Sequence, residues 1–556
     1  MITIAIDHND LLAKLSHDHV SRKNIDESDL SVSFHNNTDK SHTSLNGNFL
    51  WLQLYLEVLL RMEPSASAKA ELVQICRKYY QGNDRELIKV EKFDQTYVPS
   101  DAVTWYTRDC FIYRLINKAL RVQDINLLFA FRFLILDIFN QLRVEKSRLR
   151  RSSGNIIQCY RGQMITEEEL NQMRSNIGCF ISVNSFLSTT QDRNLAVVFA
   201  SSLDDIYEKL LFEIEADMCL LRAKPFADVT HLSIFDQEKE ILFMCGAIFQ
   251  IKNITKNEAE SLWIIQLKLC DDTNSALKEL FDYQKQKMAE TTDLISLGKL
   301  LREMGELTKA KQYYEKSLSE LPLNNSKISI CYYGLGVVLD RECNYDDALD
   351  YFRKALDFET NVLSSSNTAF MGKIYGSIGI VYYNKHCYGL ALEYLMKSLN
   401  ILLDKVGYDH GDTAMVFTNL GRAYQAEKNY DLALQNHVNA LNIKLKILPP
   451  DHPRLARSYV FIGNVYADKQ EFDLAFANYQ NALNIQLKSL PDSSISIGVT
   501  FHRIGQVCVK TGKYQSAVEN FRRADHIYKL SLPSNHQRLL QLKLDCATLE
   551  DHMTQS

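Results

Sequence analysis

At six places in the carboxy-terminal half of this chain, a glycine is followed twelve residues later by an alanine. The last four glycines are evenly spaced, and a second small residue stands nineteen residues after every glycine. An aromatic residue stands nine residues after five of the six. The pairs are Gly298/Ala310, Gly336/Ala348, Gly379/Ala391, Gly421/Ala433, Gly463/Ala475 and Gly505/Ala517. Because small residues let two helices approach closely and aromatic rings fill the gaps between helix pairs, the pattern predicts a solenoid of helix–turn–helix units.

This spacing resembles the tetratricopeptide repeat, whose basic unit is about 34 residues. The longer register seen from Gly379 to Gly505 resembles the repeat of kinesin light chain. We predict repeats over residues 290–530 and a capping helix and tail over 531–556. A peptide or protein partner is expected in the groove that stacked repeats form. His410 and His452, which are separated by the same interval as the glycines, fit either a metal pair or turn and cap residues, and the second is the more common role.

Composition limits the class of protein. Glycine (21) and proline (9) are scarce, which favours long helices. The net charge is −5 and no basic block is present, so nucleic acid is not an expected partner. The twelve cysteines form no CxxC pair, so reduced thiols and no metal are expected. The amino terminus lacks a secretory pattern and no apolar stretch reaches ~20 residues, so we expect a cytoplasmic protein without a membrane span.

The amino-terminal half changes character along its length. Residues 1–47 are mostly polar and are predicted to form a flexible segment without structure. Apolar residues then recur at helical intervals up to about residue 148, and alternating runs at 210–216, 240–251 and 263–269 predict strands. We therefore expect a multidomain α+β protein. Its mixed helical and β domain over 48–272 is joined by a helical connector over 273–289 to the all-α solenoid.

Three motifs occur in a fixed order in the strand-rich region: Tyr-Arg-Gly at 160–162, Phe-Leu-Ser-Thr-Thr at 186–190 and Glu-Lys-Glu at 238–240. Each suits cleavage of the nicotinamide glycosidic bond of NAD. The guanidinium of Arg161 can fork onto phosphate oxygens. Gly162 permits close approach of the backbone to a flat ring. Each motif taken alone is a weak signal.

Glu238 and Glu240 stand two residues apart at the start of a predicted strand, so in extended backbone both face the same side. One carboxylate can stabilise the positive charge that grows on the ribose as nicotinamide leaves. The other can orient or deprotonate a cationic acceptor such as a guanidinium. Two solvated glutamates at a strand edge are the alternative for this motif taken alone.

Taken together, the motifs resemble the R-S-E signature of arginine-specific mono-ADP-ribosyltransferases of the clostridial toxin-like and vertebrate ecto-enzyme branch. The resemblance implies that Arg161 holds the dinucleotide, that Ser188 orders the catalytic glutamate and that Glu240 is that glutamate. It associates Glu238 with arginine as the target and the loop over 229–237 with substrate recognition. Phe199 matches an aromatic residue that faces nicotinamide in the family, and a core phenylalanine fits it equally well.

The resemblance has departures. Thr190 stands where the family has a serine, and the secretion signal and disulfides of the vertebrate ecto-enzymes have no counterpart. The implied co-substrate is NAD, or NADP in its place, and the implied substrate is a protein with an accessible arginine. Two other functions remain open. The chain could be a catalytically inert interaction scaffold, or an NAD glycohydrolase with water as acceptor.

Overall fold

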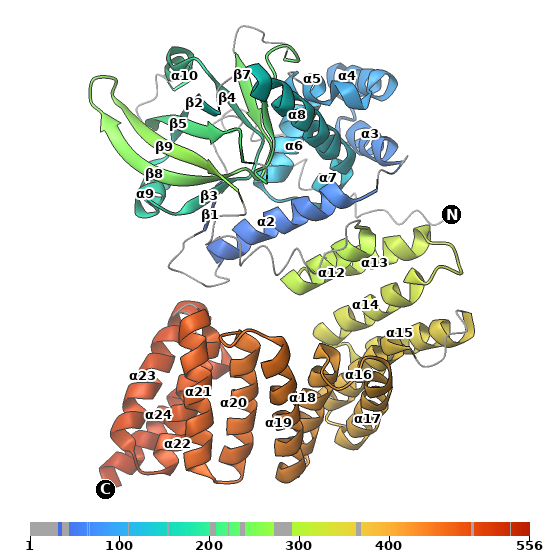
Figure 1. Ribbon diagram of the computed structural model, residues 1–556, viewed down its shortest axis with the longest axis vertical. Helices are drawn as coiled ribbons and strands as arrows, with labels where there is room; N and C mark the ends of the chain where they lie inside the picture. The colour runs from blue at the N-terminus through green and yellow to red at the C-terminus, as the bar shows by residue number, and fades with distance from the viewer. Residues whose placement is uncertain are drawn as a thin grey trace. The chain divides into compact units, whose positions relative to one another are not determined.

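The computed structural model divides the chain into two units, with the boundary between Leu297 and Gly298. The structure describes residues 32–35, 44–63, 65, 67–108, 110–152, 155–200, 207–220, 222–233, 239–271, 292–362, 368–490, 494–533 and 535–555. The described part of the first unit contains a mixed sheet with helices, and that of the second contains only helices (Figure 1). The expected order of a mixed helical and β region and an all-α solenoid is thereby confirmed. The predicted connector at 273–289 lies outside the described residues.

Within the described residues, nine strands form one sheet in the order β1-β3-β8-β9-β5-β2-β4-β7-β6. Neighbouring strands pair antiparallel, except that β5 pairs parallel with β9. The strands are β1 (Val32–His35), β2 (Ile156–Ile165), β3 (Phe180–Val183), β4 (Leu187–Thr190), β5 (Glu208–Asp217), β6 (Phe226–Asp228), β7 (Glu240–Phe243), β8 (Ile248–Asn257) and β9 (Leu262–Cys270). The strands predicted at 210–216 and 263–269 are confirmed. The run at 240–251 is two strands, because Gly246 turns the chain with φ +76°.

Most helices of the first unit gather on one side of its sheet (Figure 1). They are α2 (Ser44–Arg61), α3 (Ala68–Tyr79), α4 (Asp84–Thr96), the 3-10 turn η1 (Pro99–Asp101), α5 (Ala102–Thr107), α6 (Phe111–Arg121), α7 (Ile125–Ala130) and α8 (Arg132–Ser152), with α9 (Glu167–Ser175) and α10 (Arg193–Phe199) between strands. Gln53 of α2 joins helix to sheet. Its buried amide donates to Ser182 Oγ (2.9 Å) and to the carbonyl oxygen of Gly246 (2.7 Å). Both acceptors are distant from Gln53 in the chain, so this contact fixes the helical layer on the sheet.

The prediction of a structureless segment over residues 1–47 is wrong in two places. Val32–His35 form strand β1, which pairs antiparallel with β3, and helix α2 begins at Ser44. Edge pairing uses main-chain N–H and C=O groups, so a short strand forms in a polar segment that would not be selected by composition. The first unit also extends to Leu297, beyond the predicted end at residue 272.

The repeats are pairs of antiparallel helices, with the signature glycine in the first helix and the alanine in the second. The helices are α12 (Leu294–Met304), α13 (Leu307–Glu320), α14 (Lys327–Arg341), α15 (Tyr345–Asp357) followed by the π-helix η3 (Phe358–Val362), α16 (Ala369–Asn384), α17 (Tyr388–Lys405), α18 (Gly411–Ala426), α19 (Tyr430–Ile447), α20 (Pro453–Asp468), α21 (Phe472–Ser489), α22 (Ile495–Lys510), α23 (Tyr514–Ser531) and α24 (Gln537–Gln555). All six signature alanines are 0% exposed, so a larger side chain has no free space there. Helix α24 contacts α23, and Asp545 of α24 accepts from His502 Nε2 at 2.7 Å, so the predicted capping helix is present.

Each signature glycine packs against the side chain sixteen residues later, on the second helix of its own pair. A Cβ added to the glycine would lie 2.4–3.1 Å from that side chain. The six partners are Tyr314, Phe352, Leu395, His437, Tyr479 and Phe521. The glycine is therefore required by the side chain opposite it, because any Cβ would push the two helices apart.

The turn inside each pair is also periodic. Seven residues after the glycine, the chain takes a left-handed conformation with φ between +60° and +88° in all six repeats. Glycine occupies this position in two repeats, and Cys343, His386, Lys428 and Gln470 occupy it in the others. A left-handed residue directly after a helix turns the chain so that N–H groups beyond the helix bond its last carbonyl groups, and the helix ends there. The turn geometry is therefore the same even where the residue is not glycine.

The two histidines that share the repeat interval are helix caps. His410 Nδ1 accepts from the main-chain N–H of Asp412, and His452 Nδ1 accepts from that of Arg454, both at 3.1 Å. They are the N-cap residues of α18 and α20. The interpretation as turn and cap residues is confirmed.

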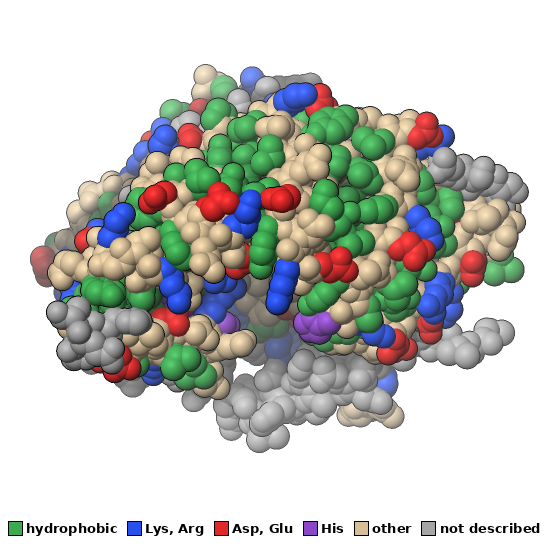
Figure 2. Space-filling view, turned by 90° about the horizontal axis from the view of Figure 1, so that it is seen from below, with side chains coloured by type: hydrophobic (Ala, Val, Ile, Leu, Met, Phe, Trp, Pro, Cys, Tyr) green, Lys and Arg blue, Asp and Glu red, His purple; other side chains and the backbone are tan. Residues whose placement is uncertain are grey.

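Surface character gives two further facts about the described residues. Among them, no helix combines the length and the apolar character needed to cross a bilayer. Exposed hydrophobic residues recur on the second helices of the repeats, as at Leu390, Leu432 and Leu474, which are 36–47% exposed. Hydrophobic side chains lie among charged ones on the face shown in Figure 2.

Gly463→Ala should destabilise the repeats by about 1–3 kcal/mol, because the new Cβ would lie 2.6 Å from Cε1 of the buried Tyr479. Gly389→Ala is the matched control. It lies near the start of α17 with nothing within 4 Å of its Cβ position, so it should be neutral or stabilising by up to about 1 kcal/mol. Urea unfolding of both variants checks this. Equal effects of the two substitutions would contradict the packing argument.

His437→Phe should remove an acid-sensitive step in stability. Burial, with Lys444 and Arg422 nearby, lowers the pKa of His437 from 6.5 to about 4. The unfolded chain therefore binds a proton near pH 6.5 that the folded chain does not bind until pH 4, and stability falls as the pH drops through this window. The loss is on the order of 3 kcal/mol. Thermal midpoints between pH 7.5 and 4.5 should fall less steeply in the variant than in wild type. The exposed His526→Gln should match wild type.

Candidate functional site

Three neighbouring strands bring together the predicted residues Arg161, Ser188 and Glu240. Arg161 lies on β2, Ser188 on β4 and Glu240 at the start of β7, and the sheet order places β4 between the other two. In the β4–β7 register, Thr190 stands opposite Glu240, so Ser188 is its diagonal neighbour on the same face. Residues far apart in sequence therefore meet across one part of the sheet.

Ser188 holds the carboxylate of Glu240. Its Oγ donates to Glu240 Oε1 at 2.6 Å, a short O–H···O bond. Glu240 is only 6% exposed, so water does not compete strongly for this bond. One carboxylate oxygen is thereby fixed at the strand end.

Arg161 connects β2 to the same serine. Its Nη1 donates to the main-chain carbonyl of Ser188 (2.8 Å), and its Nε donates to Gln163 Oε1 (3.3 Å). Both acceptors are neutral. No carboxylate of the described residues forms an ion pair with Arg161, so its charge remains available to an anion such as a phosphate.

The other two hydroxyls of the serine motif have structural roles. Thr189 Oγ1 donates to the carbonyl of Ile241 (2.8 Å), which ties β4 to β7. Thr190 Oγ1 accepts from the N–H of Asp192 (3.0 Å) at the turn before α10. The departure from serine at position 190 therefore leaves a hydroxyl that makes the turn. The hydroxyl of Ser188 is the one described as donating to the carboxylate of Glu240.

Gly162 has a packing role that its sequence context did not reveal. A Cβ at this position would lie 1.7 Å from the carbonyl oxygen of Ala196 and 2.8 Å from the nitrogen of Ala200. Helix α10 therefore lies directly on the backbone of β2, and only glycine allows this approach. The other role predicted for Gly162, close approach of its backbone to a flat ligand ring, stays a prediction.

Phe199 ends helix α10 and is 55% exposed. The interpretation of Phe199 as a core residue is therefore wrong. The helix that carries it packs on β2 and β4, the strands of Arg161 and Ser188. An exposed ring on this helix is consistent with a ligand contact, which stays a prediction.

The predicted recognition loop over 229–237 is described only in its first part. Glu238 and residues 234–237 lie outside the described residues. At the start of the loop, the main-chain N–H of Val229 donates to the carbonyl oxygen of Glu240 (2.9 Å). The loop therefore leaves the sheet directly beside the candidate catalytic glutamate, and its role in substrate recognition stays a prediction.

The backbone before Glu240 departs from the expected geometry. Lys239 has φ +44°, a left-handed conformation, and β7 begins only at Glu240. The argument that Glu238 and Glu240 share one face assumed extended backbone through Lys239. That assumption is wrong, because the alternation of side chains holds only within a strand.

Two residues near the site were missed in the sequence. Gln163, which is 6% exposed, follows Arg161 by two positions on a strand, so the period of two would have identified it. Tyr106 of α5 is 1% exposed and its ring lies 4.8 Å from that of Phe186, directly before β4. Burial raises the pKa of Tyr106 well above its ordinary value, with Tyr113 and Glu240 adding to the rise. No local pattern marks Tyr106, because only the packing of the helices on the sheet places it here.

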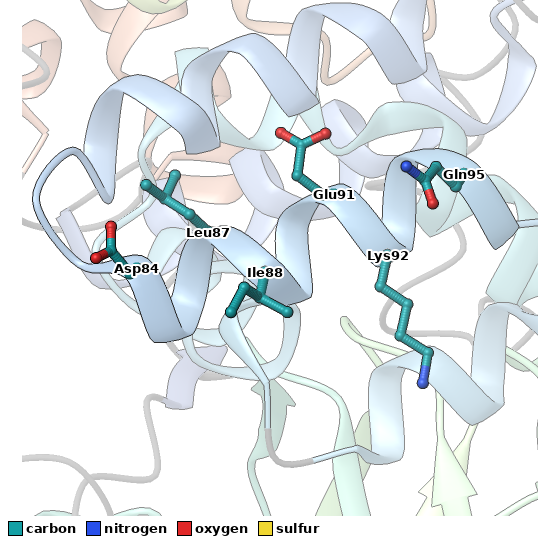
Figure 3. Close-up of a pocket in the computed structure, with 6 residues that line it drawn as sticks. All are labelled: Asp84, Leu87, Ile88, Glu91, Lys92 and Gln95. Carbon is teal, nitrogen blue, oxygen red and sulfur yellow. The ribbon is translucent and has the colours of Figure 1, made fainter.

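A separate surface hollow contains none of these residues. It is lined by Asp84, Leu87, Ile88, Glu91, Lys92 and Gln95, which all belong to helix α4 (Figure 3). A hollow along one helix supplies no convergent groups from other elements, so we do not assign it a function. Within the described residues, no group of three or more His, Cys, Asp or Glu side chains is arranged to hold a metal ion.

Comparison with known families identifies the repeats. Residues 289–358, 370–446, 412–488 and 454–528 match the family model of the tetratricopeptide repeat. The predicted repeat type is therefore confirmed. The matched residues all lie downstream of Arg161, Ser188 and Glu240, so this match does not bear on the site. A comparison with curated proteins finds no match.

Several solved structures are similar to part of this chain. The crystal structure of BtubC (BKLC) from P. vanneervenii is 18% identical, covering 42% of this chain and 94% of that chain with a TM-score of 0.36. The TPR-like repeats of a kinesin light chain candidate from Podosopora anserina are 18% identical, covering 37% and 98% with a TM-score of 0.33. The apo form of the quorum sensor NprR from B. thuringiensis is 15% identical, covering 49% and 75% with a TM-score of 0.36.

Gly162→Ala should destabilise the first unit by about 3 kcal/mol or more, because its Cβ would overlap the Ala196 carbonyl and neither backbone can move without separating α10 from β2. Gly178→Ala is a control without a steric clash, although its φ of +86° gives it a backbone cost of about 1–2 kcal/mol. Denaturant unfolding followed by tryptophan fluorescence measures both. A Gly162→Ala variant as stable as wild type would contradict the close approach.

Proposed function

We propose that this chain combines two functions: its tetratricopeptide repeats bind a protein partner, and its amino-terminal unit transfers ADP-ribose from NAD to arginine side chains of a protein. The observation that carries the second part is the chain of contacts from Arg161 through Ser188 to Glu240. The carboxylate of Glu240 and the guanidinium of Arg161 both form hydrogen bonds with Ser188. No carboxylate of the described residues forms an ion pair with that guanidinium. The first part is supported by the family match over the repeats.

The chemistry follows from the charges of the substrate. NAD carries an anionic pyrophosphate, which the guanidinium of Arg161 would bind. As the bond between nicotinamide and ribose C1′ breaks, positive charge grows on the ribose, and the carboxylate of Glu240 would stabilise it. A guanidinium nitrogen of the target arginine then forms the new bond to C1′, nicotinamide leaves as a neutral molecule, and the proton lost from the nitrogen passes to water. Ser188 acts through Glu240, by holding one of its oxygens in place.

An interaction scaffold without catalysis is the second candidate function. It is favoured by the family match, which lies entirely within the repeats. The geometry at Glu240 favours the transferase instead, because an inert unit has no chemical need for a buried carboxylate beside an arginine that lacks a described acidic partner.

Glu240→Gln should reduce ADP-ribosylation of agmatine by at least ~100-fold, because a neutral amide cannot stabilise the developing cation. Ser188→Ala should reduce it by roughly 10-fold, the value of one hydrogen bond of about 1.4 kcal/mol. Glu215→Gln, on β5 and ion-paired with Lys268, is the control and should retain activity. Labelling with radioactive NAD measures all three.

The outcomes separate the alternatives. Full labelling by Glu240→Gln would refute the transferase assignment. If wild type consumes no NAD, with or without agmatine or protein, the scaffold is the better description. Release of nicotinamide at the same rate with and without agmatine, and without labelling, identifies an NAD glycohydrolase.

A further inference from the structure

We propose that the cationic cluster formed by Arg422, Lys444, Arg454 and Arg457 on helices α18, α19 and α20 is the docking site for an acidic segment of a partner protein. The proposal rests on the partner-binding role of the repeats and not on the transferase activity. The partner segment is expected to contain several Asp or Glu side chains.

The cluster lacks counter-ions. None of its four cations forms an ion pair with a carboxylate of the described residues. Lys444 Nζ donates to two neutral hydroxyls, Thr418 Oγ1 at 3.1 Å and Ser458 Oγ at 2.9 Å. Elsewhere in the repeats, many surface lysines are paired. Examples are Lys373 with Asp412, Lys446 with Asp409 and Lys469 with Asp431.

The cations are close enough to repel one another. Burial, together with Arg457 and Arg454, lowers the pKa of Lys444 to about 8. Burial and then Arg422 and Arg454 lower the pKa of Arg457. A repelling cluster weakens the free protein, so its presence is best explained by an anion that relieves the repulsion on binding.

His437 lies at the same place and breaks the repeat pattern. It occupies the position where the other five repeats have Tyr, Phe or Leu against the signature glycine. Its side chain is 1% exposed, and its Nε2 has no hydrogen-bond partner among the described residues. Its ring stacks on Phe461, with centroids 5.3 Å apart, and the guanidinium of Arg457 lies 5.3 Å from the same phenyl ring. The repeat pattern therefore changes beside two of the cations, Lys444 and Arg422.

The extent of the cluster favours an acidic protein segment. Lys444 bridges α18 and α20, and Arg422 lies 4.4 Å from the ring of Tyr383 on α16. The first helices α16, α18 and α20 contact one another in sequence, so the charges and rings extend over three repeats. The aromatic rings beside two of the cations offer contacts to the apolar parts of a peptide, whereas a nucleic acid would require a longer basic track.

The test is a selection of random twelve-residue peptides displayed on phage, with the full-length protein as bait. Peptides retained by wild type should contain at least ~3-fold more Asp and Glu than the starting library. The double variant Arg422→Gln/Arg457→Gln should lose this enrichment, and each single variant should bind the best peptide at least ~10-fold more weakly in fluorescence polarisation. The charge-retaining Arg422→Lys/Arg457→Lys should keep it, and so should Lys446→Gln, the control whose lysine is ion-paired.

The proposal fails if acidic residues are not enriched, or if the enrichment persists in the double glutamine variant. It also fails if a twenty-nucleotide RNA displaces the best peptide at equal concentration, which would identify a nucleic-acid surface instead. Labelling of agmatine should be unchanged in the double variant. If the wild-type protein binds acidic peptides but does not label agmatine, the transferase proposal is refuted and the docking proposal stands.

Discussion

Close packing of another element against the backbone of a glycine is the constraint on which both halves of this protein depend. In the repeats, every signature glycine lies under a side chain of the opposite helix, and a Cβ would come within 3.1 Å of it. In the first unit, Gly162 allows α10 to lie on β2 at a distance that excludes any Cβ. The superhelix and the candidate site therefore use the same device. The absence of a Cβ sets these distances, because one added methyl group would push the packed elements apart.

This constraint also explains why the site is well positioned. The β2, β4 and β7 strands carry Arg161, Ser188 and Glu240, and α10 covers two of these strands. The site is thus built on paired strands and supported by a helix at van der Waals distance. Such support holds the hydrogen bond from Ser188 to Glu240 in one geometry, which a carboxylate on a loop would lack.

The candidate site was only partly predictable. Arg161, Ser188 and Glu240 were identified by the resemblance of their motifs to the R-S-E signature, and the structure joins them through hydrogen bonds to Ser188. Gln163 follows from strand period alone. Tyr106 does not, because its place depends on how α5 packs near β4. The pairing of Glu238 with Glu240 by strand alternation failed at Lys239, whose left-handed backbone interrupts the period.

The sequence by itself determined the repeats, because each repeat of a periodic fold needs the same kinds of residue at the same packing positions. Glycine, alanine and aromatic positions recur since each unit solves the same local contact. Tertiary structure alone decided what has no period. It placed a strand in the polar segment at 32–35 and packed helix α10 against Gly162. It also brought Arg422, Lys444 and Arg457 together without an acidic partner among the described residues. These features depend on groups that are distant in sequence, and no local pattern records which charges or backbones will meet.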